Sequence, residues 1–472
     1  MMIRNISLVL LAAFLGFSSR GQQMLVPPYI QPGNATGKEQ KVLIWQTDSL
    51  PGNYKVEYFL NAPEHKTSLA KITFVTLYLN KKTTLLYRAA LTGLKFDSDY
   101  TYHLTLDGQT IANELFATRT EKQQTKFAVF GDCGAGSPEQ AAVAYQVYQQ
   151  KPQFVLVTGD NVYQSGLESE YRKNFFPYYN AKEANILIGA PLMKSIPFYM
   201  ILGNHDVYGS ELDKTEDGLA YFYFNDLPLN GPFTESAVKA TGPAERVKKF
   251  KSNTRSRYPK MSNFSYDYGN VHIACLDANT YINPLDPALV SWIKEDFRKS
   301  SADWKIVSYH HPGFSSSIAH YDYQIMRLLS PVLEQLGVDL VLTGHVHNYQ
   351  RSLPLTFDPK KDASGSHYMV TDEGRVDGKF VIDEKYNGSS NTKPKGIIYI
   401  VTGSGGAGLY DPSFTNKPEL WKHDPPENWV PFTAKFVSNI HSFTMIETDG
   451  KRLVLKQVDK NGVAFDQIAI TK

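Results

Sequence analysis

The sequence predicts an α/β fold in which a mixed-sheet layered domain follows an all-β sandwich domain. Between residues 126 and 350, short continuous apolar runs alternate with helix-like stretches. Such runs are typical of strands that are buried on both faces of a sheet covered by helices. Ahead of them, residues 24–119 contain short strand patterns separated by turn residues, which is typical of a β-sandwich.

The first 21 residues have the features of a cleaved export signal. Arg4 supplies a positive charge, residues 6–17 are apolar, and residues 19–21 offer a small-x-small cleavage site. The apolar run is shorter than the roughly 20 residues that a membrane-spanning helix needs. We therefore predict a signal peptide at 1–21 and a secreted or periplasmic protein.

The sandwich is predicted from its strand patterns and from one hairpin. The strand patterns are at 42–45, 54–58, 84–89 and 100–105. Asp107-Gly108 marks a tight turn after the last of them. The later strands resemble those of a fibronectin type III-like module. Since residues 120–125 are polar, we place the sandwich at 24–119 and the second domain at 126–472.

The second domain contains helix-like stretches and two long polar insertions. We predict helices at 138–150, 286–299 and 321–336. The insertions cover roughly 207–262 and 356–394, and loops of this length in a compact domain are usually functional or mobile. Asp449-Gly450 marks a hairpin between two strands near the C-terminus.

Composition excludes several classes of protein. The net charge of the 472 residues is +2, and no basic run occurs, so we expect no nucleic-acid binding. Only two cysteines occur, which excludes a disulfide scaffold. No segment after the signal is long and apolar enough to span a membrane. The oligomeric state is not indicated.

Five apolar runs end in side chains that can bind metal ions. The runs and their polar ends cover residues 127–132, 154–160, 198–206, 304–311 and 340–347. Ligands bind at the carboxyl ends of strands in such sheets. The donors at these ends, or just beyond them, are Asp132, Asp160, Tyr163, Asn204, His310, His345 and His347.

The types of donor indicate two metal ions. Asp132 and Asp160 would repel each other in one cleft unless a cation lay between them. A phenolate such as that of Tyr163 is a hard, anionic donor that favours trivalent iron. His345 and His347 project to the same side of an extended segment, which suits adjacent metals. The set is too large for one closed site and fits two metals about 3.5–4 Å apart.

These segments resemble a known family. The motifs at 131–134, 159–163, 203–206, 307–310 and 344–347 look like the five ordered motifs of purple acid phosphatases, which are calcineurin-like metallophosphoesterases. The order of five motifs, each behind a strand, is highly specific. The resemblance implies a layered metallophosphoesterase domain, and the sandwich ahead of it is similar to that of the plant-type members.

The resemblance also implies how the metals are held. Asp132, Tyr163 and His347 would bind Fe(III). Asn204, His310 and His345 would bind a divalent ion, which is Zn, Mn or Fe. Asp160 would bridge the two ions.

Three further residues are assigned roles toward the substrate. The resemblance implies that His205, together with Asn204, contacts the phosphoryl group, and that His320 is the acid for the leaving group. The partner histidine that plant-type members carry just before this position is Ala319 here, so acid catalysis would rest on one imidazole. Arg351 is a candidate for pairing with the substrate phosphate, although an arginine after a turn is often in a surface ion pair.

The smaller features near these motifs have plainer interpretations. We expect His311 to orient a metal ligand. The glycine-rich segment 403–408 lacks the lysine of a phosphate-binding loop, so we expect a tight turn beneath the metal site.

The predicted function is that of an exported binuclear-metal acid phosphatase. It would hydrolyse phosphate monoesters of small phosphorylated substrates through attack by metal-bound hydroxide. One alternative is a phosphodiesterase or nucleotide pyrophosphatase that uses the same metal pair. Another is a binding protein whose metal domain is vestigial, but the intact set of donors argues against it.

Overall fold

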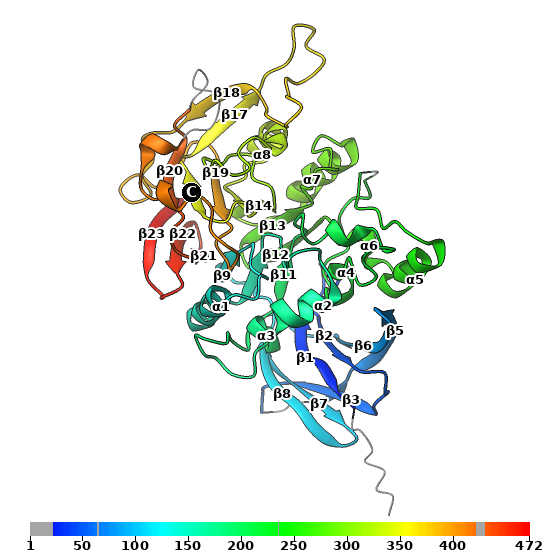
Figure 1. The fold of residues 1–472 in the computed structure, drawn as a ribbon. Helices are drawn as coiled ribbons and strands as arrows, with labels where there is room; N and C mark the ends of the chain where they lie inside the picture. Colours follow the sequence, from blue (N-terminus) through cyan, green and yellow to red (C-terminus); the bar gives the residue numbers. More distant parts are fainter. Residues whose placement is uncertain (1–21, 64–65, 235, 422–429) are drawn as a thin grey trace, which may run out of the picture.

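The computed structural model describes residues 22–63, 66–234, 236–421 and 430–472 (Figure 1). The signal peptide predicted at 1–21 lies outside these residues. Within the described residues, no helix combines the length and apolar character needed to cross a membrane.

The N-terminal part consists of two antiparallel four-stranded sheets, with strand orders β1-β2-β6-β5 and β4-β3-β7-β8. Side chains of both sheets share one buried core, in which Trp45 and Tyr87 stack with ring centroids 5.1 Å apart. This confirms the predicted all-β sandwich. The strands are β1 (Met24–Gln31), β2 (Lys41–Thr47), β3 (Tyr54–Leu60), β4 (Ser68–Leu69), β5 (Lys71–Leu79), β6 (Lys82–Leu91), β7 (Asp99–Leu106) and β8 (Gln109–Ala117).

The predicted hairpin joins β7 and β8. Leu106 pairs with Gln109 across the turn, and the two residues between them, Asp107 and Gly108, have φ angles of 50° and 82°. Two consecutive positive φ angles match the twist of the flanking strands, which is why an Asp-Gly pair is favoured there.

The second part is built on two mixed sheets. Their strand orders are β11-β10-β9-β21-β22-β23 and β12-β13-β14-β15-β19-β16-β20, and buried side chains from both belong to one core. The strands are β9 (Gln124–Phe130), β10 (Phe154–Val157), β11 (Phe198–Met200), β12 (Phe264–Tyr268), β13 (Val271–Leu276), β14 (Trp304–Tyr309), β15 (Leu340–Thr343), β16 (Tyr349–Ser352), β19 (Ile398–Thr402), β20 (Thr433–Val437), β21 (Ser442–Asp449), β22 (Arg452–Asp459) and β23 (Ala464–Thr471). A separate antiparallel pair is formed by β17 (Leu355–Pro359) and β18 (Gly378–Ile382).

The strands that carry the candidate ligands are parallel. β10 pairs in parallel with β9 and β11 in the first sheet, and β14 pairs in parallel with β13 and β15 in the second. β10, β11, β13 and β15 are buried along their whole length, and β9 and β14 are buried in the half that leads to the ligands. Their carboxyl ends therefore come together at one edge of the layered core.

Helices flank the sheets, and one of them, α5, packs against β5 of the sandwich (Figure 1). They are α1 (Pro138–Gln150), α2 (Glu168–Glu170), α3 (Phe176–Tyr179), α4 (Tyr221–Phe224), α5 (Ala244–Thr254), α6 (Arg257–Lys260), α7 (Pro287–Lys299) and α8 (Ser330–Gln335). Short 3-10 or π turns are η1 (Tyr171–Phe175), η2 (Leu192–Lys194), η3 (Tyr208–Ser210), η4 (Ile325–Leu329), η5 (Pro412–Phe414) and η6 (Pro418–Leu420).

Two of the three predicted helices are found and the third is much shorter. α1 begins with a cap in which the Ser137 side chain accepts from the backbone N–H of Gln140, and Asp286 caps α7 in the same way. The helix predicted at 321–336 is wrong in extent, because a 3-10 turn at 325–329 precedes an α-helix of only six residues. Pro331 follows that turn, and a proline fits the first turn of a helix but not its interior.

Candidate metal centre

Two aspartates begin sharp turns at the ends of neighbouring strands. Asp132 follows β9 and Asp160 follows β10, and both have a left-handed backbone with φ angles of 55° and 49°. Glycines on adjacent loops approach their carboxylates. A Cβ on Gly203 would collide with Oδ1 of Asp160, and one on Gly344 would lie 2.7 Å from Oδ2 of Asp132. The glycines before the motif residues therefore leave room for the carboxylates.

The structure forms two donor groups that share one residue. Asp160, His310 and His345 form the first group, and Asp132, Asp160 and His347 form the second. Within each group the potential ligand atoms lie within 4.8 Å of one another. Asp160 belongs to both, so the geometry provides two adjacent cation positions that share a carboxylate.

The two remaining predicted donors lie beside these groups. Asn204 Oδ1 is 3.1 Å from His310 Nε2. The Tyr163 hydroxyl is 3.0 Å from His347 Nε2 and 3.4 Å from Asp132 Oδ1. Each group therefore has one further oxygen donor within reach, an amide at the first and a phenol at the second.

Backbone carbonyls fix the orientation of two histidines. His310 donates from Nδ1 to the carbonyl of Thr158 at 2.8 Å, and His347 donates from Nδ1 to the carbonyl of Gly408 at 2.7 Å. A proton held on Nδ1 leaves the lone pair of Nε2 available to a metal. In both residues, Nε2 is the atom that faces the other donors.

The electrostatics of the centre call for cations. Asp132 and Asp160 are 0% and 1% exposed. Burial and the charge of Asp160 raise the pKa of Asp132 well above its ordinary value. Burial also acts on Asp160, but the charge and hydrogen bond of His310 outweigh it and lower its pKa to about 2. Burial lowers the pKa of His347 to about 4, so this imidazole is neutral and ready to bind a metal in mildly acidic solution. The residues present therefore fit a pair of metal ions.

His205 lies beside the two groups with one nitrogen free. Its Nδ1 donates to the carbonyl of Gln164 at 2.7 Å, and its Nε2 is 3.9 Å from Asp160 Oδ2. The ring sits between those of Tyr163 and Tyr208, with centroid distances of 4.5 and 4.9 Å. The imidazole is thus held in place while Nε2 remains able to contact a ligand.

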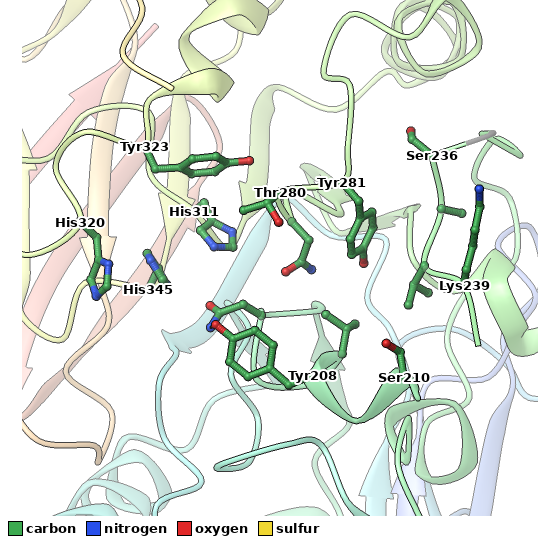
Figure 2. A pocket seen from close by; sticks show the side chains of 15 residues that line it. Tyr208, Ser210, Ser236, Lys239, Thr280, Tyr281, His311, His320, Tyr323 and His345 are labelled. Carbon is green, nitrogen blue, oxygen red and sulfur yellow. The ribbon is translucent and has the colours of Figure 1, made fainter. Parts of the chain in front are cut away.

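A cavity of about 660 Å³ opens beside the first donor group (Figure 2). Asn204 and His345 line it, and so do the predicted residues His311 and His320. The His320 ring lies 4.5 Å from that of His345, and the His311 ring lies 4.2 Å from it. The cavity therefore joins the candidate metal positions to the predicted leaving-group acid.

Arg351 is not brought together with the other candidates. Its guanidinium donates to both carboxylate oxygens of Asp466, at 2.7 and 3.0 Å, and it does not line the cavity. The Tyr349 hydroxyl donates to the same carboxylate. The structure thus places Arg351 in a buried ion pair and gives no support for a contact with substrate phosphate.

Several residues that support the centre were not assigned by sequence reasoning. Asp206 accepts from the backbone N–H groups of Gly203 and Asn161, at 2.9 and 3.2 Å, and so ties two ligand-bearing loops together. Its place within the third motif was the signal for it. Tyr410 stacks on the ring of His347 at 4.2 Å, and no sequence pattern pointed to it.

The glycine-rich segment 403–408 packs beneath the second donor group, as expected. Gly405 donates to the carbonyl of Gly131, and Ala407 donates to the carbonyl of Asp132, at 3.1 and 2.9 Å. A Cβ on Gly403 would lie 2.6 Å from Asp132 Oδ2. The segment therefore supports the turn that presents Asp132.

The fold and this site define the class of the second part of the chain. Residues 125–349 match the family model described as calcineurin-like phosphoesterase. The chain is similar, more particularly, to purple acid phosphatases, which confirms the resemblance inferred from the motifs. It is 32% identical to purple acid phosphatase 17 of Arabidopsis thaliana over 235 residues, which are 48% of this chain and 62% of that protein.

A second curated relative and two solved structures are also similar to the chain. Purple acid phosphatase 15 of Arabidopsis thaliana is 24% identical over 65% of this chain and 56% of its own length. The chain thus spans less than two thirds of these curated relatives. Purple acid phosphatase PPD1 from yellow lupin (Lupinus luteus) has the same fold, with a TM-score of 0.63, 16% identity and coverage of 94% of this chain and 74% of that one. PhoD follows with a TM-score of 0.55, 12% identity and coverage of 94% and 92%.

Proposed function

We propose that this protein is an acid phosphatase-type metallophosphoesterase that hydrolyses phosphate monoesters with two metal ions. The observation that carries the proposal is that Asp160 belongs to both donor groups. Two adjacent cation positions with a shared carboxylate are the arrangement that in-line displacement at phosphorus uses. The similarity of the chain to purple acid phosphatases supports the same reaction.

The metals of the proposal follow from the donors beside each position. Asp132, Tyr163 and His347 would hold Fe(III), because a phenolate favours a trivalent ion. Asn204, His310 and His345 would hold Zn, Mn or divalent Fe, with Asp160 between the two ions. Such a pair, when bound, supplies Lewis acidity and lowers the pKa of water.

The side chains around the centre bind the ester and move a proton. As an imidazolium, His205 can donate from Nε2 to a phosphoryl oxygen while Nδ1 donates to the carbonyl of Gln164, so no reorientation of the ring is needed. Asn204 faces the same space from the cavity wall. His320, on the far side of His345, would protonate the departing oxygen, a step that typically contributes about 10²–10⁴-fold.

The role of His320 has a direct test. For an ester with a good leaving group, His320→Ala should lower kcat little, because the alcohol departs without a proton. For an alkyl phosphate, the same change should lower kcat by about 10² or more. An equal loss for both esters would contradict the assignment.

A phosphodiesterase or nucleotide pyrophosphatase is the second candidate, since a cavity of about 660 Å³ can take a second ester group. Purified protein, supplied with iron and zinc, should hydrolyse a mono-aryl phosphate faster than a bis-aryl phosphate. The reverse preference would favour the second candidate. Absence of turnover for both esters, in protein that holds two metals, would overturn the proposed function.

Two further parts of the proposal concern the rest of the chain. The division into domains at 24–119 and 126–472 is supported by the core that the two sandwich sheets share. The outer face of one of these sheets packs on the second part, where Tyr29, Ile44 and Leu86 join its core. Limited proteolysis should cut near 120–125. Export is supported by the sequence pattern of residues 4–21. N-terminal sequencing of the mature protein should begin close to residue 22.

A further inference from the structure

The cavity beside the metal centre extends well beyond the candidate ligands. In Figure 2, His320 and His345 lie at one end of its lining, Ser236 and Lys239 lie at the other, and tyrosines lie between. Its volume of about 660 Å³ falls within the roughly 300–1,000 Å³ of pockets that enclose drug-sized molecules. A phosphate group alone does not need this space, so it is available to the alcohol portion of an ester.

Two tyrosines present aromatic surface to this space. Tyr208 is 59% exposed and Tyr281 is 36% exposed, and both line the cavity. Many large aromatic side chains of this protein are buried in its core, whereas the rings of Tyr208 and Tyr281 are exposed in the cavity. A ring with an open face can stack on a planar group of a ligand.

The hydroxyl ends of both tyrosines are anchored. Asn204 donates from Nδ2 to the Tyr208 hydroxyl at 2.8 Å. The Tyr281 hydroxyl donates to Oδ2 of Asp277 at 2.9 Å, and Asp277 is itself buried and accepts from the Asn279 side chain. Both rings are therefore held in one position before a ligand arrives, which lowers the entropic cost of stacking.

The charges of the lining restrict the ligand further. Lys239 is the one residue with a fixed charge among the described lining residues, and none of these residues is a carboxylate. Hydroxyl groups of Ser210, Ser236 and Thr280 supply hydrogen-bonding partners. This lining accepts a neutral or anionic group and contains no carboxylate to balance a cation.

The geometry points to a leaving-group subsite, walled by Tyr208 and Tyr281, that selects phosphate monoesters of alcohols carrying a planar ring. This inference rests on the proposed phosphatase function and names the substrate class of the same site. The phosphate would lie at the two donor groups, and the ring would extend along the cavity between the tyrosines.

Benzyl phosphate and ethyl phosphate test the subsite, because both release a primary alkyl alcohol and differ mainly in the ring. We expect kcat/KM for benzyl phosphate to be about tenfold higher, as stacking of aromatic pairs is worth up to about a factor of ten. Binding of benzylphosphonate and methylphosphonate to the two-metal protein, measured by calorimetry, should show the same preference without turnover.

Tyrosine substitutions test whether Tyr281 causes the preference for benzyl phosphate over ethyl phosphate. Tyr281→Leu should reduce the benzyl-to-ethyl ratio to near one, whereas Tyr281→Phe should keep most of it. Tyr148→Leu is the matched control, because Tyr148 is 37% exposed and lies on α1, away from the lining residues; its ratio should equal that of the wild type.

The outcomes separate the two proposals. Equal kcat/KM for the two esters, with normal turnover, would overturn the subsite and leave the phosphatase function standing. Equal affinity for the two phosphonates would overturn the subsite whether or not the protein turns over any ester. No hydrolysis of any ester, together with a preference for benzylphosphonate, would support the subsite and overturn the proposed reaction.

Discussion

Replacement of Asp160 by asparagine should remove both metal ions from the centre. Asp160 is the residue that the two donor groups share, and asparagine preserves its size and one oxygen while removing the charge. That oxygen can still accept from the backbone N–H of His205, as Oδ1 of Asp160 does at 2.9 Å. The change is therefore electrostatic with little change in packing.

The magnitude follows from charge. Opposite unit charges about 4 Å apart interact by about 4 kcal/mol at an effective dielectric constant of about 20, which corresponds to about a thousandfold in Kd. Metal ions with two or three charges, closer to the carboxylate, lose at least this much. Protonation of His310 does not explain the expected loss of metal. The charge of Asp160 raises the pKa of His310 to about 9 against the effect of burial. Removing that charge lowers the pKa of His310 and therefore favours the neutral imidazole, which is the form that binds a metal.

Metal content measured by mass spectrometry after purification without chelator is the assay. The wild type should hold two ions per chain, and Asp160→Asn should hold fewer than one, with loss of phosphatase activity. Asp277→Asn is the matched control, because Asp277 is also 0% exposed but belongs to neither donor group, so it should keep both ions. Two ions bound to Asp160→Asn with unchanged affinity would refute the shared-carboxylate centre.

Four other outcomes are expected. Tyr163→Phe, loaded with iron to the same content as the wild type, should lack a visible tyrosinate-to-iron absorption band; a band that survives would exclude this phenolate as the iron donor. Tyr208→Phe removes the hydroxyl that accepts from Asn204 Nδ2 at 2.8 Å, so affinity for the divalent ion, measured by titration, should fall by about 10–100-fold while the iron band persists. Arg351→Met removes the ion-pair partner of the half-buried Asp466, which keeps only the Tyr349 hydroxyl, and should destabilise the protein by up to about 3 kcal/mol in denaturant unfolding, with KM unchanged; a raised KM would restore Arg351 to the substrate site. Hydrogen bonds to two aspartates, at 2.8 and 2.9 Å, outweigh burial and raise the pKa of His272 to about 9. The resulting stability is fully present below the ordinary pKa of about 6.5 and is lost as pH rises through 9, so the gap in Tm between the wild type and His272→Gln should be wide at pH 6 and narrow at pH 9.5.

Sequence reasoning predicted the strand ends well because four of the five combine two strong signals. A buried parallel strand is a continuous apolar run, and a glycine next to a polar residue marks its end. Such local patterns identified Asp132, Asp160 and His345 without any knowledge of their distances. The carboxyl ends of parallel strands meet at one edge, so the topology then brings the residues together.

Features that depend on distant partners were not predictable in this way. Arg351 resembles a phosphate-binding arginine until its pairing with Asp466 is seen, and the two are 115 positions apart. Tyr410 stacks on His347 from a loop with no motif. The helix expected at 321–336 is wrong in extent because Pro331 fits the first turn of an α-helix but not its interior, so the α-helix begins only at Ser330, after the 3-10 turn at 325–329.

The hydrogen bonds around the histidines explain why the site can exist before a metal arrives. His310 and His347 each have Nδ1 committed to a backbone carbonyl, so their tautomers and ring positions are set by the folded backbone itself. Gly203 and Gly344 leave the space that the two carboxylates occupy. In the folded chain the cluster holds protons instead: the charge of Asp160 raises the pKa of His310 to about 9 against the effect of burial, and burial and the charge of Asp160 raise the pKa of Asp132. It follows that metal binding must neutralise a cluster that is already in place, so loading should release protons and become weaker as pH falls, with little change in the backbone.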